Sequence, residues 1–341
     1  IDGQRRRYDT GGNSNEWSAR IERPIRIGGK AELDQDLGDT TERIARAELA
    51  EARHEAARAL ADLWIDWLAA IQARELAKEQ LGFAESSASA VAGRRRAGDA
   101  SLLDLNAAQA DAAEARRKLD VALAQEAKAI LRLRSRFPSL VMEPRPLSEP
   151  VELELDEAQW RERVLAESDT LRIMQASLKR AELTAERARA DRIPDPTVGI
   201  FTASEARRSE RIVGISVSIP LGGTYRRETM LEALKQADVA RAELERQRKE
   251  IDLATAETIN DARTALRRWK LAEQSTQMAQ ENAKLGQRGY GLGEGDLQSL
   301  LLLRRQSVDA AGASLSSRIE ALKARNRLLI DAHLIFGLAD E

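Results

Sequence analysis

The stretch VGISVSIPLGGTYRRE, residues 213–228, changes character in its middle. Apolar side chains alternate with glycine and serine as far as Ile219, a period of two that predicts a β-strand with one apolar face. Pro220 and the pair Gly222–Gly223 end this pattern. A charged, alanine-rich segment without proline follows, and its composition predicts a long helix. A short strand that leads directly into a long helix is therefore the feature that decides the fold.

The composition favours long, thin helical packing over a thick globular core. Of the 341 residues, 32% are charged and only 4% are aromatic, and the mean hydropathy is −0.47. The net charge of −2 gives no reason to expect nucleic-acid binding. The absence of cysteine excludes thiolate metal sites and fits an oxidising compartment. No apolar run is long enough to predict a transmembrane helix.

The same order of features occurs earlier in the chain. Residues 17–29, WSARIERPIRIGG, also alternate apolar and polar side chains, contain a proline and end in Gly-Gly. A further glycine follows each Gly-Gly pair after about seventy residues, Gly98 after Gly29 and Gly293 after Gly223. Both halves therefore read as strand, Gly-Gly, long helix, glycine turn and second helix, which predicts an internal two-fold repeat.

The repeat predicts a mainly α protein with a small β part, in which the helices form long antiparallel hairpins. A helix of about 65 residues would be on the order of 100 Å long. Trp64 and Trp67 fall at helical spacing and are expected in the seam between helices. The expected divisions are a first repeat 1–136 (hairpin 4–27, long helix 31–95, tip 96–101, return helix 101–136), a proline-rich linker with a short helix at 137–168, and a second repeat 169–341 (helix 169–192, hairpin 197–219, long helix 225–289, tip 291–296, return helix 296–335).

Each half also predicts one β-hairpin. The expected strands are 4–9, 17–27, 197–205 and 211–219, joined by turns at 10–17 and 205–209. Two lone hairpins are marginal in water, and four strands cannot close a barrel, whose lower limit is about eight. Strands with one apolar face that several copies of a chain donate can close a barrel in a membrane.

At this point the sequence resembles the TolC-type outer-membrane efflux channels. The resemblance rests on RPIRIGG (23–29) and SIPLGG (218–223) at the strand-to-helix junctions, and on AGDASLLDL (97–105) and LGEGDLQSL (292–300) at the helix turns. The segment ADRIPDPTVGI (190–200) is similar to the CzcC-like subfamily, which serves heavy-metal cation efflux. The resemblance covers essentially the whole chain.

The resemblance implies an exit duct without chemistry of its own, at the outer membrane of a Gram-negative bacterium. Three chains would each give four strands to one transmembrane β-barrel, continuous with a periplasmic tunnel of helices. The implied partners are two further copies of the chain, a periplasmic adaptor (membrane fusion) protein, an inner-membrane RND-type transporter and outer-membrane lipid. The alternatives are the same fold exporting drugs or polypeptides, and a soluble elongated coiled-coil scaffold.

The family pattern also has a leading helix and a complete first strand, which this sequence lacks. Since the sequence opens without an initiator methionine, we expect either that it begins late or that it is a deletion variant. The residues that would turn the chain from barrel to tunnel are Pro24, Gly28, Gly29, Pro220, Gly222 and Gly223.

The two helix turns carry the most specific local signals. Gly98 and Gly293 permit the positive φ of a tight turn, Ser101 and Asp104 have the spacing of a capping box, and Asp296 is placed to cap the last helix. Helix capping alone would account for these residues. The resemblance adds an adaptor contact, made by Ala97, Gly98, Asp99, Ala100, Ser101, Leu102, Leu292, Gly293, Glu294, Gly295, Asp296 and Leu297.

Related channels close at the tip with acidic residues on the second return helix. The matching positions here are Ser299 and Leu302, and neither is acidic. Asp104 is the first-repeat equivalent of Ser299, so an acidic constriction would be built by Asp104, Asp296 or Glu294. A ring of such carboxylates would favour cations. The candidate lumen gate is therefore Asp104, Ser299 and Asp296, with ordinary capping as the alternative.

The sequence offers no catalytic residues, no metal site and no cofactor motif. His54 and His333 are the only histidines, are expected on different helices and have no cysteine to join them. No phosphate-binding loop and no dinucleotide-binding glycine pattern is present. The many acidic and basic residues alternate along helix faces, as is typical of solvated surfaces.

Overall fold

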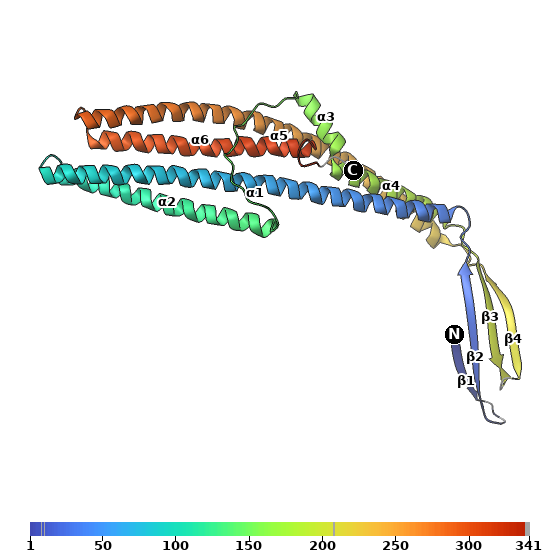
Figure 1. The fold of residues 1–341 in the computed structure, drawn as a ribbon. Coiled ribbons are helices and arrows are strands. Elements are labelled where there is room, and N and C mark those ends of the chain that lie inside the picture. Colours follow the sequence, from blue (N-terminus) through green and yellow to red (C-terminus); the bar gives the residue numbers. More distant parts are fainter. Residues whose placement is uncertain (8, 10, 207–208, 338–341) are drawn as a thin grey trace. The chain divides into compact units, whose positions relative to one another are not determined.

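The computed structural model describes residues 1–7, 9, 11–206 and 209–337. The chain is mainly helical with one small antiparallel sheet, as Figure 1 shows. The elements in chain order are β1 (Asp2–Arg7), β2 (Asn13–Pro24), α1 (Lys30–Ala97), α2 (Leu102–Arg136), α3 (Glu157–Glu167), α4 (Asp169–Ala190), β3 (Thr197–Glu205), β4 (Glu210–Ser218), α5 (Thr224–Leu292) and α6 (Leu297–Asp331).

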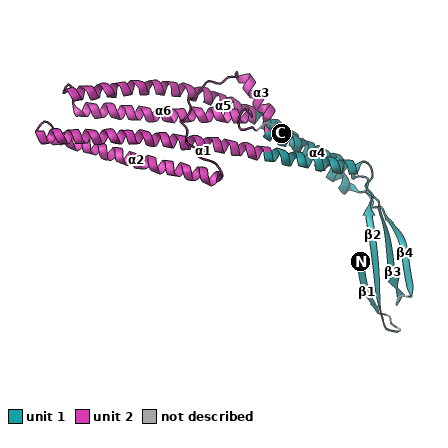
Figure 2. Ribbon diagram, viewed as in Figure 1, with its two compact units in different colours: residues 1–49, 169–249 teal, residues 50–168, 250–341 magenta. Residues whose placement is uncertain are grey.

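The chain divides into two compact units, coloured separately in Figure 2. Unit 1 comprises residues 1–49 and 169–249, and unit 2 comprises residues 50–168 and 250–341. Unit 1 therefore holds the whole sheet, α4 and the first parts of α1 and α5. Unit 2 holds α2, α3, α6 and the remaining parts of α1 and α5.

The four strands of unit 1 form a single sheet in the order β1-β2-β3-β4. The two predicted hairpins are joined because β2 also pairs with β3, with Ile21 opposite Ile200. Ile200 in turn lies opposite Ile215 of β4. Residues directly opposite one another in a sheet share a face, so the apolar residues of three strands line up across it.

The strands of the first hairpin begin and end at other residues than the sequence predicted. β1 pairs with Asn13–Ser18, and β2 begins within the segment that was expected to turn. Glu16 explains the earlier start, because this buried carboxylate accepts a hydrogen bond from the side chain of Gln4 at 2.9 Å. β2 ends at Pro24, which has no N–H for the ladder, so Ile25 and Ile27 lie outside the strand on which they were expected.

Parts of the two predicted hairpin turns lie outside the described residues. These are Thr10 at the first turn and Arg207 and Arg208 at the second, and Tyr8 of the expected strand 4–9 also lies outside the described residues. Residues 338–341, at the end of the expected second repeat, also lie outside them.

In unit 2 the helices form two antiparallel pairs. α1 and α2 are linked by the ion pair of Arg74 with Glu126 at 3.1 Å. α5 and α6 are linked by the hydroxyl of Thr276, which donates to the carbonyl of Ala310 at 2.9 Å. The paired helices match in length between the two halves, with 68 and 35 residues in the first and 69 and 35 in the second.

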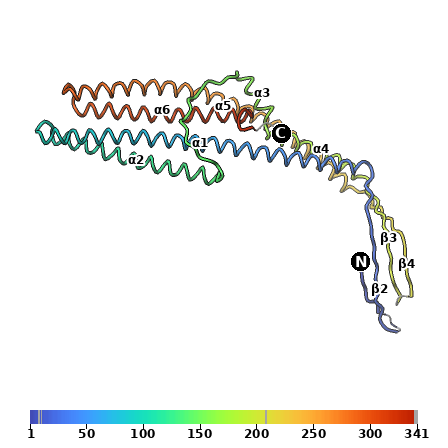
Figure 3. Tube along the Cα trace, in the orientation of Figure 1, coloured from blue at the N-terminus to red at the C-terminus, as the bar shows by residue number. Residues whose placement is uncertain are grey.

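The core of unit 2 consists of small separate clusters along the helix seams. One cluster contains Trp67, with Trp64 packed against it, so the prediction that these tryptophans lie in a seam is confirmed. A second cluster is centred on Trp160 of α3, which packs against Ile259 and Leu328. Figure 3 shows the irregular segment 137–156, in green, which runs from the end of α2 to the start of α3.

Within the described part of the chain, none of the helices is both long and apolar enough to cross a membrane.

Candidate functional site

The turn between α1 and α2 has the geometry that its sequence predicted. Gly98 has a φ of +91°, a left-handed conformation in which a Cβ would be strained. The amide of Asp99 donates back to the carbonyl of Arg94 at 2.8 Å, which closes the end of α1. α2 then starts with a complete capping box, because the Asp104 amide donates to Ser101 Oγ at 3.0 Å and the Ser101 amide donates to Asp104 Oδ2 at 3.1 Å.

The turn between α5 and α6 repeats this geometry with different residues. Gly293 has a φ of +79°, and the amide of Glu294 donates to the carbonyl of Gly289 at 2.9 Å. Asp296 is the N-cap of α6, because its carboxylate accepts from the Ser299 amide at 2.9 Å and from the Ser299 hydroxyl at 2.7 Å. Both predicted caps are therefore confirmed, although the second is not a full capping box.

The two turns also pack against each other within unit 2. Val91 of α1, Ala108 of α2 and Leu297 of α6 form one buried cluster. The guanidinium of Arg94 lies 5.0 Å from the ring centre of Tyr290 on α5. The residues of the two tips are mainly exposed, except for the buried Leu297 and the half-buried Ala100. The structure thus brings the two predicted tips together as one exposed end of unit 2.

The candidate gate residues lie on these same two turns. Asp104 is half-buried, while Asp296 and Ser299 are exposed. The hydrogen bonds from the Ser299 amide and hydroxyl lower the pKa of Asp296. All three side chains take part in capping, so within one chain they already have a structural role.

A charge cluster holds the first strand-to-helix junction in unit 1. Lys30, the first residue of α1, is only 1% exposed, and its ammonium donates to Asp195 Oδ1 and to the carbonyl of Ile193, both at 2.7 Å. Asp195 also accepts from the amide of Ile27 at 3.1 Å. The hydrogen bond from Lys30 lowers the pKa of Asp195, and the Ile27 amide adds to this effect. This lysine could not be singled out from the sequence, because it is one charge among many at a helix start.

The predicted junction residues lie around this cluster. Pro24 ends β2, and Gly28 and Gly29 both have positive φ before α1 begins. In the second half of the chain, Pro220, Gly222 and Gly223 lie in the connection between β4 and α5. That connection contacts the segment between α4 and β3, since Arg226 of α5 donates to the carbonyl of Asp191 at 2.7 Å. Lys30 of the first junction binds the same segment.

One face of the sheet carries an exposed apolar surface. Ile21, Ile200, Val213, Ile215 and Val217 share this face, and each is at least 60% exposed. The opposite face is more polar, with Ser18, Arg20, Glu22 and Ser216. Among the described residues, β1 and β4 each pair with a neighbouring strand on one side only. The sheet therefore has both an apolar face and two edges that a further strand can join.

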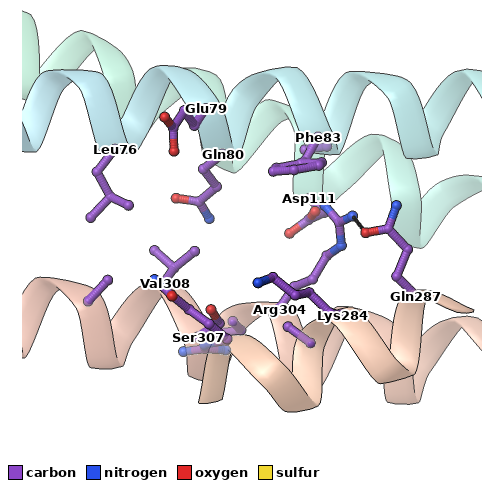
Figure 4. Close-up of a pocket in the computed structure, with 15 residues that line it drawn as sticks. Leu76, Glu79, Gln80, Phe83, Asp111, Lys284, Gln287, Arg304, Ser307 and Val308 are labelled. Atoms are coloured by element: carbon purple, nitrogen blue, oxygen red, sulfur yellow. Dashed lines mark hydrogen bonds between the residues drawn. The ribbon is translucent and has the colours of Figure 1, made fainter. Parts of the chain in front are cut away.

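A pocket of about 290 Å³ lies between the two helix pairs of unit 2, where side chains of α1 and α2 face those of α5 and α6 (Figure 4). The Arg304 guanidinium covers the ring of Phe83 at 4.4 Å and donates to Gln287 at 3.0 Å. Burial lowers the pKa of Arg304 and raises that of Asp111. Because the lining contains both cations and carboxylates, it does not select a ligand by charge alone.

The two histidines are brought together, which their positions in the sequence did not suggest. His54 lies on α1 and His333 follows the end of α6, so only one of them lies within a helix. Their ring centres are 5.1 Å apart in an edge-to-face arrangement, and both are buried.

No family model and no curated protein sequence matches the chain. Solved structures do match its fold. The outer-membrane channel OprN has a TM-score of 0.81 at 17% identity, over 97% of this chain and 79% of that one. CusC, studied for its folding and transmembrane channel formation, has a TM-score of 0.82 at 14% identity, over 97% and 81%.

The MtrE outer-membrane channel of Neisseria gonorrhoeae, in its open state, has a TM-score of 0.75 at 18% identity, over 99% of this chain and 79% of that one. At these identities the likeness establishes the fold. The chain therefore has the fold of these outer-membrane channels, in agreement with the fold that its junction and turn motifs implied.

Proposed function

We propose that the chain is one protomer of a homotrimeric, TolC-type outer-membrane efflux channel. The observation that carries the proposal is the sheet, whose apolar face is exposed and whose edge strands β1 and β4 are each paired on one side only in the described chain. Burying five exposed valine and isoleucine side chains is worth on the order of 10 kcal/mol. Such a surface indicates a site that lipid or further copies of the chain cover.

The number of strands favours three copies over two. Two chains would supply eight strands, about the number at which side chains fill the inside of a barrel. Three chains would leave room for a lumen through which a substrate passes. In this arrangement β4 of one protomer pairs with β1 of the next, so that no edge remains open.

The helices then form a periplasmic tunnel, and the tips at 97–102 and 292–297 contact the adaptor protein. The equal helix lengths and the repeated turn geometry support an internal duplication. An RND-type transporter in the inner membrane would drive export through the adaptor, and the channel itself would conduct passively. Asp104 and Asp296, with Ser299 beside them, would line the closed end of the tunnel and favour cations.

For the cargo we propose heavy-metal cations, because residues 190–200 are similar to the CzcC-like subfamily. Drugs or polypeptides are the alternative cargo for the same fold. The alternative from another class is an elongated coiled-coil scaffold, which would not need a sheet with an exposed apolar face.

The proposal is tested by the mass of the full-length mature protein in mild detergent, with planar-bilayer conductance on the same sample. We expect a trimer with a steady, cation-preferring conductance. Asp104→Asn should reduce the cation preference, while Asp120→Asn, at an exposed position of the same helix, should leave it unchanged. A water-soluble monomer or dimer without conductance would refute the channel and favour the scaffold.

A further inference from the structure

The only two histidines of the chain meet at one buried place in unit 2. His54 is 3% exposed and His333 is 8% exposed. Each offers a ring nitrogen as a metal ligand, and these two atoms lie within 4.8 Å of one another. Nothing in the proposed channel function uses either side chain.

Each imidazole also faces a carboxylate of the same unit. His54 Nε2 lies 3.5 Å from Asp331 Oδ1, and His333 Nδ1 lies 3.7 Å from Glu167 Oε2. Histidines that bind a metal through one ring nitrogen commonly direct the other towards a carboxylate, which fixes the ring and makes it a stronger ligand. An ion bound through His54 Nδ1 and His333 Nε2 would leave these two carboxylates where they orient the donors.

We propose that His54 and His333 together bind one divalent transition-metal ion of the zinc class. Imidazole suits zinc, cobalt, nickel and copper, whereas magnesium and calcium prefer a full set of oxygen ligands. Oxygen atoms from water or a carboxylate complete the coordination. The site is distinct from the proposed tunnel gate, and since both histidines belong to one chain it does not depend on trimer formation.

The surroundings add one constraint on the site. Arg58 donates from Nε to Asp331 Oδ1 at 2.8 Å, so this carboxylate is already neutralised by a guanidinium. Asp331 is therefore a positioning residue for His54 rather than a metal ligand. Because the ion would join α1 to the segment that follows α6, we expect bound metal to stabilise unit 2.

The composition of the chain makes a clean experiment possible. There is no cysteine and no third histidine, so any imidazole-bound metal must occupy this site. The full-length protein, purified without a histidine tag and stripped with a chelator, is titrated with Zn²⁺ by calorimetry and with Co²⁺ by visible absorption. We expect the wild type to bind one ion per chain. Binding should be at least 100-fold weaker in His54→Gln and in His333→Gln. In Asp331→Asn, which removes only the positioning carboxylate, it should be roughly 10-fold to 100-fold weaker. Asp309→Asn, at an exposed position of α6, is the matched control and should bind as the wild type does.

X-ray absorption of the zinc-loaded wild type gives a second readout that needs no variant to fold. Two imidazole ligands per zinc are expected. The proposal is overturned if the wild type binds no ion, if the histidine variants bind as tightly as the wild type, or if the spectrum shows one imidazole or none.

Discussion

Removing the buried ammonium of Lys30 should loosen the junction between the sheet and the helices of unit 1. In Lys30→Met the side-chain stem keeps its length and its packing, but the charge and both hydrogen bonds of 2.7 Å are lost. Asp195 would then keep the Ile27 amide as a hydrogen-bond donor but would lose its contact with a cation. The loops at 25–29 and 191–196 should therefore open more often.

The size of the effect follows from the partners of Lys30. Breaking a buried ion pair by removing one partner typically costs 3–5 kcal/mol, most of it from the charge that remains. The side chains of Asp195 and Asp191 are 19% and 41% exposed, so water can partly solvate them after the change. We therefore expect the lower end of the range, about 3 kcal/mol, which corresponds to an increase of about 100-fold in the local opening equilibrium.

Hydrogen exchange measured by mass spectrometry on the full-length protein reports this opening directly. Peptides that cover 24–34 and 190–197 should lose protection in Lys30→Met, while Lys78→Met, at an exposed position of the same helix, should change nothing. In the double variant with Asp195→Asn the two losses should be clearly less than additive. Equal exchange in Lys30→Met and in the control, or additive losses, would show that the ion pair does not hold the junction.

Three further predictions concern the sheet, the second tip and the core. Ile215→Lys should prevent assembly in the membrane, because a lysine on the lipid-facing side of a strand costs about 2–4 kcal/mol at the bilayer midplane. Ser216→Lys, on the other face of the sheet, should still give trimers on a native gel. Equal amounts of trimer from the two variants would contradict the assigned face. The capping contribution of Asp296, whose pKa is lowered from 3.8, should be complete above pH 3.8 and be lost as the pH falls through the lowered value. Amide hydrogen exchange at the first turn of α6 should therefore become faster at low pH in the wild type, relative to Asp296→Asn. Identical pH profiles for the two proteins would refute the capping role of the carboxylate. Trp160→Ala should lower the stability of unit 2 by about 3–5 kcal/mol. Trp17 is half-exposed, so Trp17→Ala is the control. A shift in thermal unfolding no larger in Trp160→Ala than in the control would contradict the place of Trp160 in the core.

The helical part of the fold could be predicted because its signals are local. Gly98 and Gly293 mark the turns, the Ser101–Asp104 spacing marks a helix start, and long stretches without proline define the helices between them. Each of these signals acts within a few residues, so the sequence contains it directly. The alternation in β3 and β4 was equally visible, since side chains on opposite faces of a strand face different surroundings.

The features that could not be predicted depend on contacts between distant segments. The pairing of β2 with β3 joins residues that are far apart in the sequence, and alternation within each strand does not specify its partner. Lys30 and Asp195 look like ordinary surface charges until the start of α1 lies beside the segment between α4 and β3. The contact between His54 and His333 likewise exists only after α6 has returned along α1.

The central claim, that copies of the chain share one barrel, is tested most directly by cross-linking β1 to β4. The chain has no cysteine, so any thiols are those introduced. Each variant combines Arg5→Cys in β1 with one cysteine in β4, placed in turn at each position from 211 to 217. A disulfide needs Cα atoms within about 7 Å, so only directly facing positions on neighbouring strands can react. The account predicts covalent trimers on denaturing gels after oxidation of the full-length protein in outer membranes. Cross-links should form only at the positions of β4 that lie opposite residue 5 of β1 in the neighbouring copy and whose side chains share its face of the sheet. Monomers at every position, from protein that is present in the membrane, would contradict it.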